Sequence, residues 1–454
     1  MHLTSDPLRV TVTGTAPVAD GALRIDDSWP GDIPPLESVG WCGLVRHLRV
    51  TNAHGDSLAV TANGPRGWKL AQSSPTTLSF AYEVDYSQLE RLGWPAPREA
   101  AYRDSANLVL AARSLFASTG ASGECRVTFH LPPGWRASTP WPAAKPPNTF
   151  VAPSTRDLVE NLVVLTRAPR EDVVVAGFRV HVHALGTPPA LRAQMRPLLE
   201  SVVSHHVGLL GSPGRSDYVL ALLPPLDGGG ESYRGSFAAS LDSLPDSQSP
   251  ATLGNLVAHE MFHLWNGWKL VGADYASTQW FQEGFTEYVA NLAMARSGRV
   301  DADWFRSKLA YHVETARQLT TSLEDIGTRK GRPLYSAGAL VAFEWDVRIR
   351  QATQGRHDLG GFLRALVRQT NRGARAYAWA DMRAALEATA PGDWEAFYLA
   401  FVHAKASLPI GPTLAVVGQT LIEAPDGHVI ILADTAATPA AKRLWSGLLR
   451  SPGN

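Results

Sequence analysis

The hydrophobic pattern divides the chain into two unlike parts. From residue 1 to about 185, short apolar runs alternate with polar residues, and clusters of Gly, Pro, Asn and Ser separate them. A period of two with such breaks is typical of the strands of an antiparallel β-sandwich. The predicted strands are 8–15, 57–62, 77–86, 106–118, 125–132 and 173–184.

From residue 189 the spacing of apolar residues becomes helical. Residues 189–211 repeat every three or four positions, and 217–225 then form the continuous apolar run of a buried strand. Ser249 followed by Pro250 is a helix start signal, because Ser caps free N–H groups and Pro fits the first turn. The further predicted elements are helices at 249–268, 277–298, 301–319, 334–353, 358–370, 379–390 and 393–404, a hairpin near 424–434, and a last helix over 439–450.

This order of strands and helices predicts an α+β multidomain protein. A chain of 454 residues is too long for one ordinary hydrophobic core, so more than one domain is expected. We predict an N-terminal antiparallel β-sandwich domain over 1–185, a mainly helical domain over 186–410, and a short C-terminal segment over 411–454.

Composition narrows the classes of partner. The chain has 42 Lys plus Arg and 42 Asp plus Glu, so no net charge attracts nucleic acid or anionic lipid, and neither partner is expected. No stretch approaches the ~18 apolar residues of a membrane span. The first residues lack the basic and apolar regions of a signal peptide, so the chain reads as cytoplasmic, and as periplasmic or secreted if a leader has been removed.

The cysteines exclude one kind of metal site. Only Cys42 and Cys125 are present, which excludes a disulfide framework and a cysteine-based zinc cluster. A single bridge between the two cysteines stays open, beside the alternative of two free thiols.

Chemistry is concentrated in the stretch "VAHEMFHLWNGW" at residues 257–268. His259 and His263 are four residues apart, so on a helix both imidazoles face the same side and can bind one metal ion. Glu260 lies about 100° around the helix from His259, beside such an ion but free of it. This is the HExxH pattern of zinc enzymes, in which two histidines bind zinc and the glutamate is the general base.

A catalytic zinc needs a third protein ligand and one open position for water. Glu283, in "STQWFQEGFTEYV", follows His263 with 19 residues between them, enough for a turn and a second helix to return. Glu287 lies one turn further and on the same face, where it can orient a ligand histidine. A surface carboxylate in a salt bridge is the alternative interpretation of Glu287.

Two other histidines receive a structural interpretation. His181 and His183, in "FRVHVHALG", share one face of a predicted strand, but no carboxylate stands near them in the sequence. We therefore expect a packed or solvated strand face there, without chemistry.

The series "HEMFHLWN", "WFQEGFTEY" and "YSAGALVAFEWDVRIR" resembles the M61 metallopeptidases, the glycyl aminopeptidases, which are gluzincins related to the broader M1 aminopeptidase group. The stretch 26–60 resembles that family's N-terminal β-domain, and 218–237 its strand and Gly-rich loop before the zinc helix. The resemblance covers roughly residues 5–410 and implies a thermolysin-like catalytic domain after the β-sandwich. The sequence departs from the family at its end, where the PDZ domain that often follows the catalytic part is missing or reduced to the last segment, so no PDZ-mediated partner is expected.

The resemblance also implies roles for single residues. His259, His263 and Glu283 would hold one Zn²⁺ per chain, with Glu260 as the base. Tyr335 stands where the wider group carries a tyrosine that hydrogen-bonds the developing oxyanion. Glu231, with Gly229 and Gly230 before it, occupies the place of a loop glutamate that binds the free α-amine of the substrate. Between Asn266 and Glu283 the family usually has a longer, more basic segment, which leaves the shape of the pocket open here. Ser232 and Ala337 also depart from the family pattern.

These residues together predict a zinc aminopeptidase that acts on peptides with a free N-terminus, with a preference for small residues such as Gly or Ala. Two alternatives stay open. A zinc endopeptidase would use the same metal centre with an open groove, and a catalytically silent zinc protein would use its β-domain to bind a partner.

Overall fold

The structure, a computed structural model, describes residues 2–4, 8–25, 33, 36–71, 77–243, 249–326, 331–371 and 373–450. The chain forms two compact units. Unit 1 comprises Met1–Arg192 and Arg215–Gln248, and unit 2 comprises Ala193–Gly214 and Ser249–Asn454. The units interleave in sequence, because 193–214 packs with the later helices while 215–248 packs with the earlier strands. The predicted domains end at residues 185 and 410, and these limits stay predictions.

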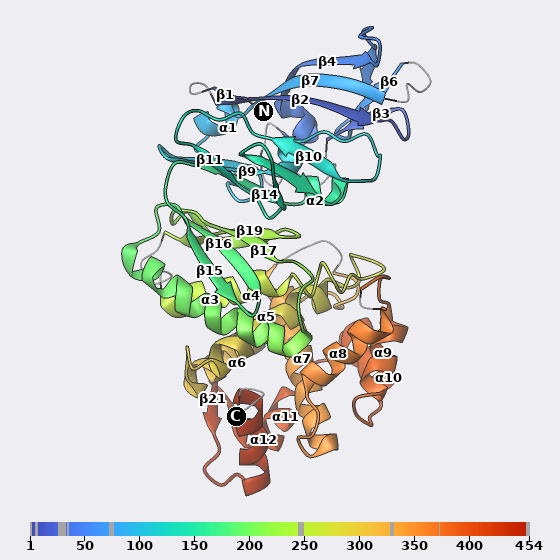
Figure 1. The fold of residues 1–454 in the computed structure, drawn as a ribbon. Coiled ribbons are helices and arrows are strands. Elements are labelled where there is room, and N and C mark those ends of the chain that lie inside the picture. The colour runs from blue at the N-terminus through green and yellow to red at the C-terminus, as the bar shows by residue number, and fades with distance from the viewer. Residues whose placement is uncertain are drawn as a thin grey trace. The chain divides into compact units, whose positions relative to one another are not determined.

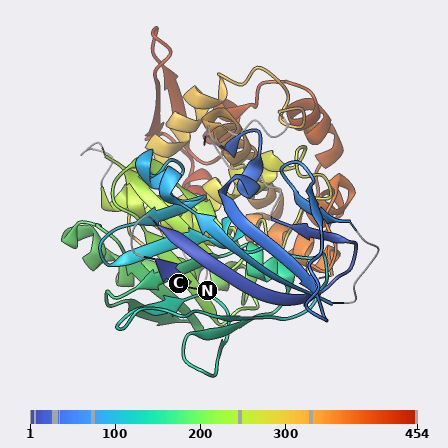
Figure 2. The same cartoon turned by 90° about the horizontal axis from the view of Figure 1, so that it is seen from above.

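Unit 1 contains four antiparallel sheets, which confirms the predicted class of N-terminal fold (Figures 1 and 2). Their strand orders are β1-β2-β7-β4, β3-β6-β5, β10-β13-β12 and β11-β14-β9-β8. The elements are β1 (His2–Thr4), β2 (Arg9–Pro17), β3 (Ala22–Arg24), η2 (Gly40–Leu44), β4 (Val45–Asn52), β5 (Val60–Ala62), β6 (Gly67–Leu70), β7 (Thr77–Asp85), α1 (Ser87–Arg91), β8 (Ala101–Arg103), β9 (Asn107–Ala111), η3 (Ala112–Ser114), β10 (Cys125–Thr128), β11 (Arg136–Ser138), β12 (Ala143–Ala144), β13 (Thr149–Ala152), α2 (Thr155–Val159) and β14 (Leu162–Thr166).

Strands β9 and β14 are buried on both faces. Leu108 and Val163 point into one core, shared with β2 and β7, whereas Val109 and Val164 point into a second core. A strand with two apolar environments has no polar alternation, so its sequence is a continuous apolar run. For this reason β14 does not stand out in the sequence as an alternating strand.

The second core is shared with a mixed sheet of order β15-β16-β17-β19-β18. Its strands are β15 (Glu171–Val175), β16 (Phe178–Ala184), β17 (Asp217–Leu222), β18 (Asp227–Ser232) and β19 (Ser236–Asp242). β16 pairs in parallel with β17, and β17 in parallel with β19. Because this sheet is mixed, 173–184 does not belong to a purely antiparallel sandwich as predicted. β15 and β16 pair in antiparallel fashion, but the other partner of β16 is the parallel strand β17, which follows helix α3 (Pro189–Leu210).

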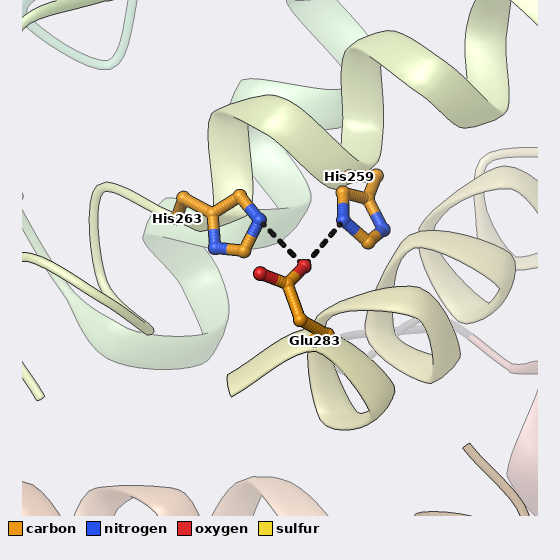
Figure 3. A group of neighbouring side chains, drawn as sticks. All are labelled: His259, His263 and Glu283. Carbon is orange, nitrogen blue, oxygen red and sulfur yellow. Dashed lines mark ion pairs between the residues drawn. The ribbon is translucent and has the colours of Figure 1, made fainter. Parts of the chain in front are cut away.

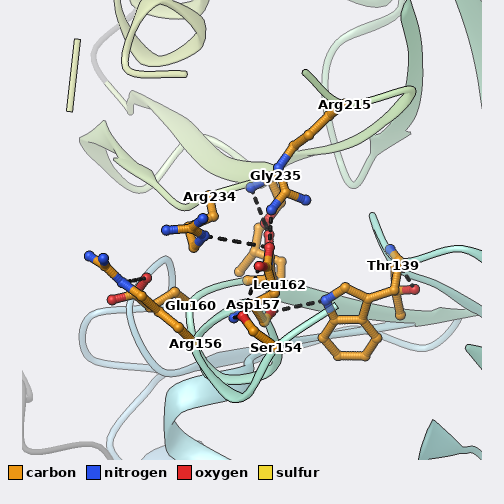
Figure 4. A network of polar contacts seen from close by, with 12 residues as sticks. Thr139, Ser154, Arg156, Asp157, Glu160, Leu162, Arg215, Arg234 and Gly235 are labelled. Atoms are coloured by element: carbon orange, nitrogen blue, oxygen red, sulfur yellow. Dashed lines mark hydrogen bonds and ion pairs between the residues drawn. The ribbon is translucent and has the colours of Figure 1, made fainter. Parts of the chain in front are cut away.

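A buried carboxylate links residues 215–235 to the earlier part of unit 1 (Figure 4). The side chain of Asp157, at 5% exposure, contacts the guanidinium groups of Arg215 and Arg234. Asn161 extends the network, since its Oδ1 accepts hydrogen bonds from the Gly235 N–H at 2.8 Å and the Ser236 hydroxyl at 3.1 Å. These contacts explain why this part of the chain packs within unit 1.

Unit 2 is mainly helical, as predicted. Ser249 caps α4 by accepting a hydrogen bond from the Thr252 N–H, with Pro250 in the first turn. The predicted helix at 393–404 is divided into α10 and a π-helical segment. Its first helix is α3 (Pro189–Leu210), of which unit 2 contains the part from Ala193 onward. The other elements are α4 (Pro250–Phe262), α5 (Gln279–Arg296), α6 (Ala302–Ala316), α7 (Arg332–Thr353), α8 (Leu359–Gln369), α9 (Trp379–Glu387), α10 (Trp394–Tyr398), η5 (Leu399–His403), α11 (Ile410–Val416), β20 (Gln419–Glu423), β21 (Val429–Ala433) and α12 (Pro439–Leu449).

Two remaining features concern membranes and redox chemistry. Within the described parts of the chain, no helix combines the length and apolarity that crossing a bilayer requires. Cys42 and Cys125 are both free thiols, so the single bridge left open by the sequence is not formed.

Candidate metal centre

Helices α4 and α5 bring the three predicted metal ligands together. His259 and His263 lie at the C-terminal end of α4, with their ring centroids 5.0 Å apart, and Glu283 lies in the second turn of α5. One oxygen of Glu283, Oε2, is 3.5 Å from His259 Nε2 and 3.4 Å from His263 Nε2 (Figure 3). All three side chains are buried, and their ligating atoms lie within 4.8 Å of one another.

The second ring nitrogen of each histidine shows that this group fits a metal ion. His263 Nδ1 is 2.9 Å from the backbone oxygen of Asn266, which can only accept, so Nδ1 carries the proton. His259 Nδ1 is 3.1 Å from a carboxylate oxygen of Glu287 and donates in the same way. With Nδ1 as the donor in both rings, the two Nε2 atoms face the same point, where a metal ion would take the place of their protons, as metal-binding histidines require.

The hydrogen bond between His259 and Glu287 shifts the pKa values of both side chains. Burial by itself would lower the pKa of His259, but hydrogen bonds to Glu283 and Glu287 raise it to about 10. Burial would raise the pKa of Glu287, yet its hydrogen bond to His259 brings it down to about 2. Glu287, with a side chain that is 15% exposed, is thus a partly buried anion directed at a ligand histidine, which favours the functional interpretation of this residue over a surface salt bridge.

We expect Glu287→Gln to weaken metal binding by roughly 10–100-fold, the usual effect of losing a carboxylate that orients a ligand histidine. Competition with a chelator of known affinity measures this. Glu324→Gln is the matched control, because it breaks another His–Glu contact of unit 2, with His403, that involves no ligand. Equal weakening in both variants would mean that Glu287 has no special relation to the metal.

A buried chain of polar side chains joins four helices near this centre. Asn255 of α4 donates to Asn291 of α5 at 2.8 Å, and Asn291 donates to His312 Nε2 of α6 at 3.1 Å. His312 Nδ1 is 3.1 Å from the hydroxyl of Ser336 in α7. Burial lowers the pKa of His312 to about 4, so it is neutral and can accept at one nitrogen while it donates at the other. The sequence gives no signal for this chain, because its members are far apart.

Asn266 is a second residue whose role was not predicted. Besides accepting from His263, it donates from Nδ2 to the backbone oxygen atoms of Phe281 at 3.0 Å and Gln282 at 3.1 Å. This fully buried residue therefore links the end of α4 to the start of α5, next to Glu283. Its position directly after the HExxH stretch, in "HLWN", was the available signal.

Two glycines set the distance between α5 and α7. A Cβ on Gly284 would overlap the backbone of Gly338, and a Cβ on Gly338 would overlap the carbonyl oxygen of Trp280. The helices therefore touch backbone to backbone, one turn after Tyr335. The ring of Tyr335 stacks on His259 with centroids 5.8 Å apart and an interplanar angle of 23°.

We expect Gly338→Ala to destabilise the protein by about 1–3 kcal/mol or more, because backbone atoms at a helix crossing cannot move aside as a flexible side chain can. Thermal unfolding measures the loss. Gly208→Ala is the matched control, since that helical glycine has open space around its Cβ position and alanine favours helix. A Gly338→Ala protein as stable as Gly208→Ala would contradict the tight crossing.

The other predicted residues divide between the units. Glu260 follows His259 in α4 and is 7% exposed, and its negative charge raises the pKa of both His259 and Tyr335. Burial is the main cause that raises the pKa of Tyr335 far above its ordinary value, so its hydroxyl stays protonated. Glu231 lies in β18 of unit 1, after Gly229 and Gly230, and forms an ion pair with Arg113 at 2.8 Å. The catalytic roles of Glu260 and Tyr335 stay predictions, and so does the substrate-binding role of Glu231, Gly229 and Gly230.

Sequence comparison finds similarity to one family in both units. The profile of the M61 glycyl aminopeptidases matches residues 252–326, and the profile of the peptidase M61 N-terminal domain matches residues 40–164. The chain is a metallopeptidase with sequence similarity to the M61 family in both matched segments. The first match contains the HExxH stretch, Glu283 and Glu287, and ends before Tyr335. No curated protein sequence matches this chain.

Solved structures share the fold at low sequence identity. An aminopeptidase N family protein from Idiomarina loihiensis has a TM-score of 0.73 at 18% identity, over 92% of this chain and 77% of that one. An M1 zinc metallopeptidase from Deinococcus radiodurans has a TM-score of 0.53 at 17% identity, over 88% and 90%. Yeast LTA4 hydrolase has a TM-score of 0.54 at 11% identity, over 88% and 66%. The chain thus shares the fold of M1 peptidases.

Proposed function

We propose that this metallopeptidase is a zinc-dependent aminopeptidase that removes the N-terminal residue of peptides, with a preference for small residues such as Gly or Ala. The observation that carries the proposal is the convergence of His259 Nε2, His263 Nε2 and Glu283 Oε2 beside Glu260. Two imidazoles and one carboxylate form a donor set typical of catalytic zinc. The proteins of similar fold that are named zinc metallopeptidases support the same ion.

When bound, zinc would lower the pKa of a coordinated water to about 7 and polarise the scissile carbonyl. Glu260 follows His259 in α4 without belonging to the ligand set, and its carboxylate takes a proton from the attacking water. The same carboxyl group then gives the proton to the departing amine. Tyr335, protonated and close to Glu283, donates its hydroxyl to the oxygen on which negative charge develops.

We expect Tyr335→Phe to lower kcat roughly 10²-fold or more with little change in KM, since the lost hydrogen bond acts mainly in the transition state. Steady-state kinetics on one substrate measure both constants. Tyr311→Phe, which alters a tyrosine of α6 that contacts Arg332, is the control. An unchanged kcat for Tyr335→Phe would remove this residue from the mechanism.

Three observations support exopeptidase over endopeptidase action. The matched family is that of glycyl aminopeptidases, and an aminopeptidase N family protein shares the fold. A Deinococcus M1 enzyme variant of TM-score 0.55 was solved with a Tyr-Ser-Ala substrate, a peptide of three residues. We propose in addition that the carboxylate of Glu231, which pairs with Arg113 at 2.8 Å, receives the free α-amine. The alternatives are an endopeptidase and a silent zinc protein. Hydrolysis of substrates with free and blocked N-termini distinguishes both from an aminopeptidase.

The test is hydrolysis of aminoacyl p-nitroanilides, glycyl and alanyl included, together with one peptide in free and N-acetylated form. Zinc content is measured on the same protein. We expect cleavage of free-amine substrates, fastest for small residues, and none of the acetylated peptide. Equal cleavage of both peptides would make the protein an endopeptidase, and bound zinc without turnover would make it a silent binding protein.

A further inference from the structure

A polar cavity in unit 1 has no part in the proposed reaction. It has a volume of 220 Å³ and is lined by residues of β11, of β14 and the loop after it, and of β16. All of these residues belong to unit 1, whereas the metal ligands belong to unit 2. Binding of a ligand in this cavity therefore does not depend on the proposed peptidase activity.

The alternation and pairing of the strands place several polar side chains at this cavity. Arg136 and Ser138 are alternate residues of β11, so both point to the same face. Thr166 of β14 lies directly opposite Arg136 in the antiparallel ladder, which places its side chain on that face as well. His183 lines the cavity from β16.

Two buried polar atoms in the lining lack a hydrogen-bond partner. Ser138 Oγ and His183 Nε2 belong to side chains of residues that are 2% and 3% exposed, and neither atom meets a partner among the described residues. Other lining groups are satisfied: the Thr166 hydroxyl donates to Asn107 Oδ1 at 2.6 Å. Because buried polar groups are almost always paired, two unpaired atoms in one cavity indicate a bound molecule.

His181, on the same strand as His183, has carboxylate neighbours, so the prediction that it has none was wrong. Its Nδ1 is 2.8 Å from Asp172 and its Nε2 is 3.3 Å from Asp217, both on neighbouring strands. Strand pairing supplies these partners, and linear sequence cannot show it. Asp172 also pairs with Arg170 at 2.9 Å, so its charge is already compensated outside the cavity.

The charge of the lining favours an anion. Arg136 is exposed at the cavity together with Arg170, whose charge Asp172 compensates, and no described residue that lines it is acidic. Burial, and then the charges of Arg170 and His181, lower the pKa of His183 to about 3, so its imidazole is neutral and carries one N–H. Asn148 Oδ1 accepts from the Ala137 N–H at 3.1 Å, which leaves the amide NH₂ of Asn148 as a further donor.

We propose that this cavity binds a small oxyanion, held by the guanidinium of Arg136 and by hydrogen bonds from Ser138 and His183. Arginine with neutral N–H and O–H donors is the combination that recognises carboxylate and phosphate oxygens. The volume is below the ~300–1,000 Å³ of sites for drug-sized ligands, which fits a single ion or a small acid. Inorganic phosphate or sulfate and a small carboxylate share this chemistry.

Titration calorimetry of the full chain with phosphate, sulfate and acetate, at constant ionic strength, tests the proposal. We expect saturable binding of one ion per chain, weakened tenfold or more in Arg136→Gln and weakened also in Ser138→Ala. Arg126→Gln is the matched control, since it removes an exposed arginine of β10 that does not line the cavity. Preference for phosphate and sulfate over acetate would identify a tetrahedral ligand, and the reverse a carboxylate.

Two outcomes would overturn the proposal. Binding that is equal in wild type and Arg136→Gln would place the ion elsewhere, and loss of that binding in Glu283→Gln would assign it to the metal centre. Absence of saturable binding for all three anions would show that water alone satisfies Ser138 and His183. Thermal unfolding of each variant verifies that it is folded.

Discussion

Glu260→Gln is expected to lower kcat roughly 10²–10⁴-fold while the protein keeps its metal. Glutamine has nearly the same shape as glutamate but cannot take a proton from water at neutral pH. Because Glu260 lies beside the ligand set of His259, His263 and Glu283 and does not belong to it, its replacement leaves all three ligating atoms in place. Kinetics on an alanyl p-nitroanilide and zinc content of the same sample measure the two effects.

The informative comparison is with added metal. If Glu260 is the base, excess zinc should not restore the activity of Glu260→Gln, since the ion is already bound. Glu314→Gln, which alters a carboxylate of α6 that contacts His428, controls for the loss of a negative charge in unit 2. Near-normal kcat in Glu260→Gln would require a different base, and loss of the metal would give Glu260 a structural role.

The sequence was sufficient to locate the metal centre because its chemistry follows helix periodicity. His259 and His263 share a helix face by their spacing alone, and Glu283 and Glu287 repeat the same spacing on the next helix. Apolar periodicity also located most helices of unit 2 and the alternating strands of unit 1. A single sequence is enough to locate an element or a site where the spacing of side chains follows directly from helix or strand geometry.

What the sequence did not reveal depends on contacts between distant segments. β14 has no alternation because both of its faces are buried, and β16 has an ordinary strand pattern whether its partner is antiparallel or parallel. His312 comes near the centre through contacts with another helix, where its Nε2 lies 3.1 Å from Asn291 and 3.8 Å from Glu287. Gly338 is important because of the backbone that crosses it, and no local property of "YSAGAL" shows which helix that is.

Glu283→Gln is expected to remove the metal, with a loss of affinity larger than the roughly 10–100-fold expected for Glu287→Gln. Its Oε2 lies within 3.5 Å of both imidazole Nε2 atoms, and its charge is the only negative charge among the three ligands. A neutral amide keeps the shape but loses the attraction for a divalent cation. Chelator competition gives the affinity, and kcat/KM measured over a zinc titration gives the activity.

The two glutamate variants at the centre should therefore fail in opposite ways. Glu283→Gln should lose activity because the metal is absent, so a high concentration of zinc should restore part of it, whereas Glu260→Gln should be full of metal and inactive. This contrast separates holding the ion from moving the proton, two roles that a simple loss of activity cannot distinguish. If Glu283→Gln bound zinc as tightly as the wild type, Glu283 would not be a ligand, and the convergence of the two Nε2 atoms on it would be an ion pair of the metal-free protein.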